Sequence, residues 1–155
     1  MLKFLFKKKT QEISESESII EKFINEHKLL VDLYVEILGL ANEHKFTTIK
    51  EKLKEFENIL FQHIQDEKEE IYNHLNEVLD KVKDSILLKE INQIKSEIVP
   101  IKKKISVIKL KYRELHHENI NNFIEDFSYL KEPILNRIDL EEKKLFLYFK
   151  KKAKR

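Results

Sequence analysis

The scarcity of turn-forming residues constrains this chain most. Its 155 residues include one glycine, Gly39, and two prolines, Pro100 and Pro133. A sheet of many strands needs a turn about every 8–12 residues, so long helices with few connections remain. We predict an all-α protein, an up-down bundle of four long helices. We expect a single domain over residues 1–155, with residues 1–15 and 151–155 frayed.

Apolar residues recur at threes and fours along four segments, as on helices with one buried face. The polar stretch "TQEISESES" indicates the start of the first helix, and Gly39 its end. We expect the second helix to begin near Thr48, where "TIKE" matches a capping box, and to end near Asp84. Pro133 suits the first turn of the fourth helix.

The third helix, expected to be the longest, carries an apolar seam that contains Pro100. Proline removes a backbone donor and clashes with the preceding turn, which predicts a kink or break just before it. An uncovered seam of this length would favour a dimer over a monomer. Its residues are spaced alternately three and four apart: Ile91, Ile94, Ile98, Ile101, Ile105, Ile108, Tyr112 and Leu115.

Charge and composition exclude several classes of protein. Residues 1–90 carry 14 Lys/Arg and 19 Asp/Glu, and residues 91–155 carry 16 and 9. No segment has the roughly 20 apolar residues of a membrane span, so we expect a soluble, cytoplasmic protein. We expect no direct DNA binding by the basic end "KKKAKR". With no Gly-rich loop and no nucleophile beside His116 and His117, we expect no enzymatic activity.

One histidine-carboxylate pair resembles a metal site. In "FQHIQDEKEEIY", His63 and Glu67 lie one helical turn apart, and a similar stretch, "RIDLEEKKLF", follows in the fourth helix. A hemerythrin-like di-iron bundle for oxygen or nitric oxide would use His27, His63, Glu67, His117 and Glu141. However, Arg137 stands where a second histidine is needed, and arginine stays protonated. An Arg137–Glu141 ion pair is simpler, and histidines on charged helices are more often exposed or at a boundary. We therefore expect no cofactor and keep a di-iron centre as the alternative.

Several segments in order resemble the Rsd/AlgQ family of anti-sigma factors. The clearest is "FIEDFSYLKEPILNRIDLEEKKLFL", residues 123–147. "LLVDLYVEILGL" and "KLKEFENIL…EEIY" resemble the family's first and second helices. "IVP", ending at Pro100, resembles a hydrophobic-proline point in the middle of the family pattern. The family's fourth-helix pattern includes Arg137 and binds no metal.

The resemblance implies binding to region four of the primary sigma factor, sequestering it from RNA polymerase. Gln62 stands where the family has an acidic residue, but acidic residues follow it. Alternatives are the di-iron bundle, and a helical scaffold or dimeric interaction protein. We expect a monomer or weak dimer. The predicted contacts are Glu55, Phe61, Gln62, Gln65, Asp66, Glu69 and Tyr72, on a surface that also carries Glu57 and Glu70.

Overall fold

The computed structural model describes residues 2–153, which form helices joined by short turns, with no strand among them. The elements are α1 (Leu2–Asn42), α2 (Phe46–Glu67), the π-helical turn η1 (Lys68–Tyr72), α3 (Asn73–Lys81), α4 (Ser85–Ser96), α5 (Ile98–Lys111), α6 (Ile120–Ser128), α7 (Lys131–Leu140), the π-helical turn η2 (Glu141–Leu145) and α8 (Phe146–Ala153).

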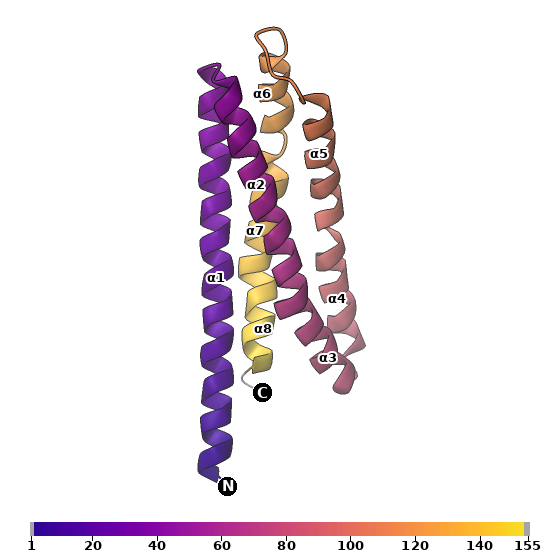
Figure 1. Cartoon of the computed structure of the whole chain (residues 1–155). Coiled ribbons are helices and arrows are strands. Elements are labelled where there is room, and N and C mark those ends of the chain that lie inside the picture. The colour runs from indigo at the N-terminus through magenta and orange to yellow at the C-terminus, as the bar shows by residue number, and fades with distance from the viewer. Residues whose placement is uncertain (1, 154–155) are drawn as a thin grey trace.

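These elements stack into the four columns of an up-down bundle (Figure 1). The first column is α1, the second is α2–η1–α3, the third is α4–α5, and the fourth is α6–α7–η2–α8. The first column packs against the second and the fourth, and the third column packs between those two. The all-α bundle predicted from the sequence is confirmed.

The first two columns begin and end at residues other than those predicted. Helix α1 begins at Leu2, within a stretch expected to be frayed, and it continues through Gly39 to Asn42. The turn is made instead by His44, whose φ is 57°. Helix α2 begins at Phe46 and has no side-chain cap, so Thr48 lies inside it and does not cap it. The second column ends at Lys81, close to its predicted end.

The third column breaks as predicted, since α4 ends at Ser96 and α5 begins at Ile98. Pro100 is the third residue of α5, where a missing N–H costs little. The prediction that this column is the longest is wrong, because α1 has 41 residues. The fourth column begins at Ile120, after a loop at 112–119.

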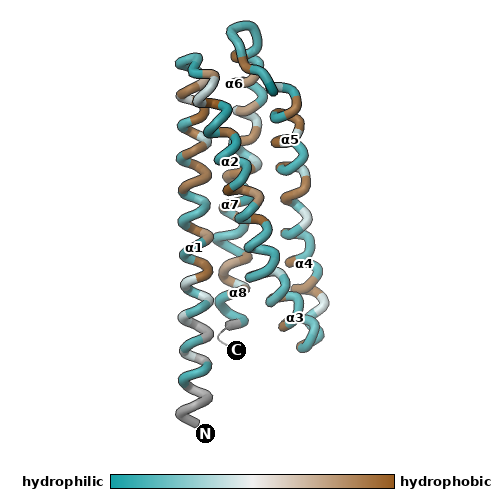
Figure 2. The backbone as a smooth tube through the Cα atoms, viewed as in Figure 1, coloured by the Kyte–Doolittle hydropathy of each residue, from teal (hydrophilic) through white to brown (hydrophobic). Residues whose placement is uncertain are grey.

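The apolar seam of the third column is covered within the chain. All its members except the half-buried Ile98 are buried. Figure 2 shows hydrophobic positions recurring along each column. The seam therefore leaves no continuous apolar face for a second copy. Within the described residues, no helix combines the length and apolar character that a membrane crossing requires.

Two apolar clusters fill the bundle. The upper core, at the end that carries the α1–α2 turn, contains Leu30, Leu33, Tyr34, Ile37, Ala41, Ile49, Phe56, Leu60, Ile101, Ile105, Ile108, Tyr112, Leu115, Ile120, Phe123, Phe127, Leu130 and Ile134. The lower core, toward the chain termini, contains Phe23, Ile71, Tyr72, Leu75, Leu79, Ile91, Ile94, Leu145, Phe146 and Phe149. In the first, second and fourth columns, a short polar interval separates the two sets along the sequence.

Candidate functional site

Five buried polar side chains occupy the interval between the two cores. They come from three columns and are 2–7% exposed. We call this group the polar layer: His27 of α1, His63 and Glu67 of α2, Arg137 of α7 and Glu141 at the start of η2. Full burial of so many ionisable groups is costly unless each one finds partners.

The two histidines and one carboxylate meet at a single point. His27 Nε2 lies 3.2 Å from His63 Nε2 and 2.8 Å from Glu141 Oε1. His63 Nε2 lies 3.1 Å from the same Glu141 oxygen and 3.3 Å from Glu67 Oε2. One ligand atom from each of these four residues falls within 4.8 Å of the others. The His63–Glu67 pair predicted from the sequence thus faces inward rather than toward solvent.

Arg137 holds the outer oxygens of the two carboxylates. Its Nε donates to Glu141 Oε2 over 2.6 Å, and its Nη2 lies 3.5 Å from Glu67 Oε1. Nη2 also donates to the Tyr72 hydroxyl over 2.7 Å, and Nη1 donates to the Ile94 carbonyl. The predicted Arg137–Glu141 ion pair is present. The guanidinium lies outside the group of inward-facing atoms, so it does not occupy their centre.

Two further carboxylates, which sequence reasoning missed, face the outer nitrogens of the histidines. His63 Nδ1 lies 3.4 Å from Glu26 Oε1, and His27 Nδ1 lies 3.6 Å from Glu142 Oε2. Neither Nδ1 atom has a hydrogen-bond partner, and neither does Glu67 Oε2. Each carboxylate directly adjoins a polar-layer residue in the sequence, which is the only signal that could have identified it.

Burial and close contact shift the protonation of the layer. Burial alone would lower the pKa of His63, but its close contacts with the Glu141 and Glu67 carboxylates raise it to about 10. Burial, together with the nearby Glu141 charge, raises the pKa of Glu67 to about 8. Burial acts in the same direction on Glu141, but hydrogen bonds from His27 and His63 hold its pKa well below the ordinary value. The direction of each shift therefore follows from burial and from the close contacts within the layer.

The predicted ligand His117 is not part of the layer. It lies in the loop at 112–119, where its Nδ1 is 2.9 Å from His44 Nδ1. That loop follows α5 at the end of the bundle that also carries the α1–α2 turn. The prediction for His117 is therefore wrong, and four of the five residues in the di-iron set come together.

A π-helical turn lies beside or at each carboxylate of the layer. Turn η1 begins immediately after Glu67, and turn η2 begins at Glu141. These are the two stretches whose similarity was visible in the sequence. A π-turn inserts an extra residue and is frequent at functional sites. The repeated sequence thus corresponds to a repeated local structure.

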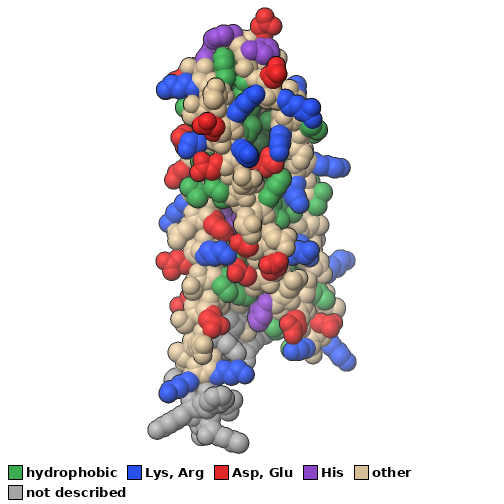
Figure 3. Space-filling model, viewed as in Figure 1, with side chains coloured by type: hydrophobic (Ala, Val, Ile, Leu, Met, Phe, Trp, Pro, Cys, Tyr) green, Lys and Arg blue, Asp and Glu red, His purple; other side chains and the backbone are tan. Residues whose placement is uncertain are grey.

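The predicted partner surface lies along the solvent side of α2 and the start of η1. Glu55, Gln62, Gln65 and Glu69 are exposed, and Asp66 is half-buried. Asp66 is bridged at 3.2 Å by Lys22 of α1, which also binds Glu70. Figure 3 views the bundle from the same side as Figure 1 and shows acidic and basic side chains interspersed over this face.

The two aromatic residues among the predicted contacts, Phe61 and Tyr72, differ in how deeply they are buried. Phe61 is half-buried against the upper core, with Lys102 Nζ 5.7 Å from its ring centroid. Tyr72 is 2% exposed and belongs to the lower core. Its prediction as a partner contact is therefore wrong. Turn η1 contains the extra residue that rotates Tyr72 inward, whereas a regular helix would have turned it away from the core.

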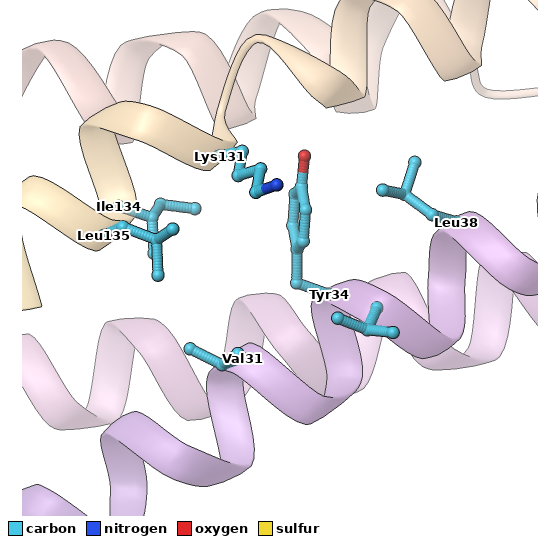
Figure 4. Close-up of a pocket in the computed structure, with 7 residues that line it drawn as sticks. Val31, Tyr34, Leu38, Lys131, Ile134 and Leu135 are labelled. Carbon is cyan, nitrogen blue, oxygen red and sulfur yellow. The ribbon is translucent and has the colours of Figure 1, made fainter.

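A separate apolar groove lies between α1 and α7 and encloses about 140 Å³. In Figure 4, Lys131 extends from the α7 side toward the Tyr34 ring. The Tyr34 hydroxyl donates to the Phe127 carbonyl over 2.8 Å. Val35 and Leu135, at 62% and 40% exposed, form the edge of the groove. The sequence did not single out this surface.

Comparison with protein families gives one match, to the family described as regulator of RNA polymerase sigma(70) subunit, Rsd/AlgQ, over residues 1–147. Neither the curated proteins nor the solved structures compared with the chain gave a match. The match covers all four columns and all five residues of the polar layer.

Proposed function

Since the chain belongs to the Rsd/AlgQ family of regulators of the RNA polymerase sigma(70) subunit, we propose that it binds region four of the primary sigma factor. Binding there would keep the factor from RNA polymerase and from promoter DNA. The family is one of regulators rather than enzymes. The observation that carries the proposal is the family match over residues 1–147 in a chain whose α2 presents exposed acidic side chains.

The chemistry of the α2 surface suits such a partner. A domain that reads promoter DNA through a helix-turn-helix carries a basic face for the phosphates. Glu55 and Glu69 are exposed. Glu55 accepts a hydrogen bond from Lys52, and Glu69 accepts one from Gln65, both within the same column. These two carboxylates offer negative charge to a basic face, which speeds association and selects the partner.

The centre of the contact is Gln62, which donates to Asp66 Oδ1 over 2.8 Å. This bond holds the Asp66 carboxylate beside the position where the family carries its own acidic residue. The half-buried Phe61, next to Gln62, supplies apolar area where a ring of polar contacts excludes water. Because the seam of the third column is covered, a monomer is sufficient for this mode of binding.

Charge reversal tests the proposal directly. We expect Glu55→Lys/Glu69→Lys to raise the Kd for purified sigma region four at least about tenfold, mainly through slower association. The difference should shrink as salt is raised, because exposed charges are screened. The matched control is Glu114→Lys/Glu118→Lys, which makes the same charge change in the loop at 112–119. Its Kd should stay within about twofold of wild type.

The alternative contact is the apolar groove between α1 and α7. If Val35→Arg abolishes binding and the α2 double variant does not, the partner binds the groove and the α2 assignment is wrong. If wild type and both double variants all fail to bind region four, the choice of partner itself is wrong. Circular dichroism of each variant separates lost binding from lost folding.

A further inference from the structure

We propose that the polar layer binds one divalent transition-metal ion. The ligands are Nε2 of His27, Nε2 of His63, and one carboxylate oxygen each from Glu67 and Glu141. This inference is independent of sigma binding, which uses the outside of α2. It rests on the distances between the four donor atoms, on their burial, and on atoms around them that have no partner.

Four of the six distances between the donor atoms are close to those around a small four-coordinate ion, and all four atoms lie within 4.8 Å of one another. Ligands about 2.0–2.1 Å from a tetrahedral ion lie roughly 3.4 Å from one another. The structure has 3.2 Å between the two Nε2 atoms and 3.3 Å between His63 Nε2 and Glu67 Oε2. The two contacts of Glu141 Oε1 are 2.8 and 3.1 Å. Moving Glu141 outward by a few tenths of an ångström would bring them close to this spacing.

The surroundings of the histidines match those of metal ligands. A histidine that binds a metal through one nitrogen usually donates its other N–H to a carboxylate or carbonyl. His63 Nδ1 faces Glu26, and His27 Nδ1 faces Glu142, with the bonds not yet made. An ion on the Nε2 atoms fixes both protons on Nδ1, where these carboxylates accept them. Glu67 Oε2, which is buried and has no hydrogen-bond partner, would coordinate the ion.

Arg137 supports the site from outside. It contacts Glu67 Oε1 and Glu141 Oε2, the oxygens opposite those that face the histidines. Each carboxylate thus has one oxygen oriented by the guanidinium and one directed inward. Two carboxylates and one guanidinium leave one net negative charge, which a dication reverses to one net positive charge.

The ligand set selects the kind of ion and the number of ions. Two imidazoles and two carboxylates suit Zn²⁺, Fe²⁺ or Co²⁺, whereas Mg²⁺ and Ca²⁺ prefer oxygen alone. A di-iron centre in a bundle uses additional carboxylate and histidine ligands. Here His117 is far from the layer, and Arg137 takes the place of a further histidine. One ion is therefore the capacity of the site.

A surface cavity reaches one edge of the polar layer. A cavity of about 310 Å³ opens between α2 and the α4–α5 break, and Glu67 and Arg137 form part of its lining. A cavity of about 20 Å³ adjoins His27 and His63 on the inner side. The break before Pro100 lies beside the first of these cavities, through Ser96 and Ile98. Of the four proposed ligands, Glu67 is the one that lines this larger cavity.

The test is Zn²⁺ binding by the whole chain, purified without a histidine tag and stripped with a chelator. Competition with a metal indicator should give one tightly bound Zn²⁺ per chain, unaffected by excess Mg²⁺. Co²⁺ should give the visible absorption of a tetrahedral site. His63→Gln and Glu67→Gln should weaken Zn²⁺ binding about 100-fold or more. The matched control, His117→Gln, should bind as wild type does.

Glu67→Gln keeps the test decisive if the histidine variant fails to fold. Glutamine has the shape of glutamate and keeps a carbonyl oxygen that can accept from Arg137, so this variant should keep the helical circular dichroism of wild type without metal. Zn²⁺ should raise the melting temperature of wild type and of His117→Gln but not that of Glu67→Gln. The absence of stoichiometric Zn²⁺ binding would overturn the proposal. Binding that His63→Gln and Glu67→Gln both retain would do the same, and would leave the layer as a structural network of buried ion pairs.

Discussion

At the scale of single residues, Arg137 is the side chain on which the core most depends. It is 7% exposed and contacts both carboxylates of the polar layer. Removing one partner from a buried charge network costs about 3–5 kcal/mol, because the remaining charges stay buried. We expect Arg137→Leu to lower the free energy of unfolding of metal-free protein by that amount in urea titrations. Arg113→Leu, the same change at an exposed position, should alter it by no more than about 0.5 kcal/mol.

A second residue-scale prediction concerns how the stability of the fold decreases at acid pH. Lys111 Nζ lies 2.8 Å from Asp126 Oδ2, and the Tyr112 hydroxyl also donates to that oxygen. These hydrogen bonds hold the pKa of Asp126 below its ordinary value of 3.8. Such a group contributes stability above the unfolded pKa and loses it as pH falls through the folded pKa. Asp126→Asn should melt lower than wild type at pH 7, and the gap should narrow near pH 3. A gap that stays constant with pH would contradict this account.

The sequence was sufficient to find much of the polar layer. The His63–Glu67 spacing is one helical turn, and an antiparallel first pair of helices brings His27 to the same depth. The location of His117 could not be predicted in this way, because it depends on where the third helix ends. Tyr72 was misplaced for a different reason. The extra residue of η1 breaks the 3.6-residue periodicity on which such predictions rest.

At the scale of elements, the two prolines have the same position. Pro100 is the third residue of α5, and Pro133 is the third residue of α7. In the first turn of a helix, the N–H that proline lacks would have no partner within the helix, and the fixed φ of proline is already helical. Proline also lowers the conformational entropy of the unfolded chain. We expect Pro100→Ala and Pro133→Ala each to lower the free energy of unfolding by about 0.4–1 kcal/mol. A Pro100→Ala variant more stable than wild type would mean that α4 and α5 are one strained helix.

The four predicted helices correspond in number and order to the four columns, while several of their predicted ends are wrong. The four columns follow from apolar periodicity and from the shortage of turn residues. The end of α1 does not, because the helix continues through Gly39 and the chain turns at His44, whose φ is positive. The turn between α3 and α4 likewise uses a positive φ at Lys83. Non-glycine residues adopt this conformation at a modest cost. A search for glycine at turns therefore misses both.

At the scale of the whole molecule, the two cores differ in size. The upper core has 18 buried members and the lower core has 10, counted over the described residues. Regions with less buried apolar surface open at lower free energy. We expect amides near Leu75 and Leu145 to exchange with solvent at lower denaturant than those near Phe56 and Phe123. Equal protection at all four positions would show that the bundle opens only as a unit.

The polar layer has a consequence for cooperativity. Apolar contacts transmit packing from one end of a bundle to the other, whereas a band of charges contributes stability that depends on its occupants. The lower core can therefore unfold locally while the upper core stays folded, so the two cores act as two foldons that meet at the polar layer. A ligand at that band would couple the foldons without touching either one. Ligand binding at the polar layer would then determine how cooperatively the two cores unfold.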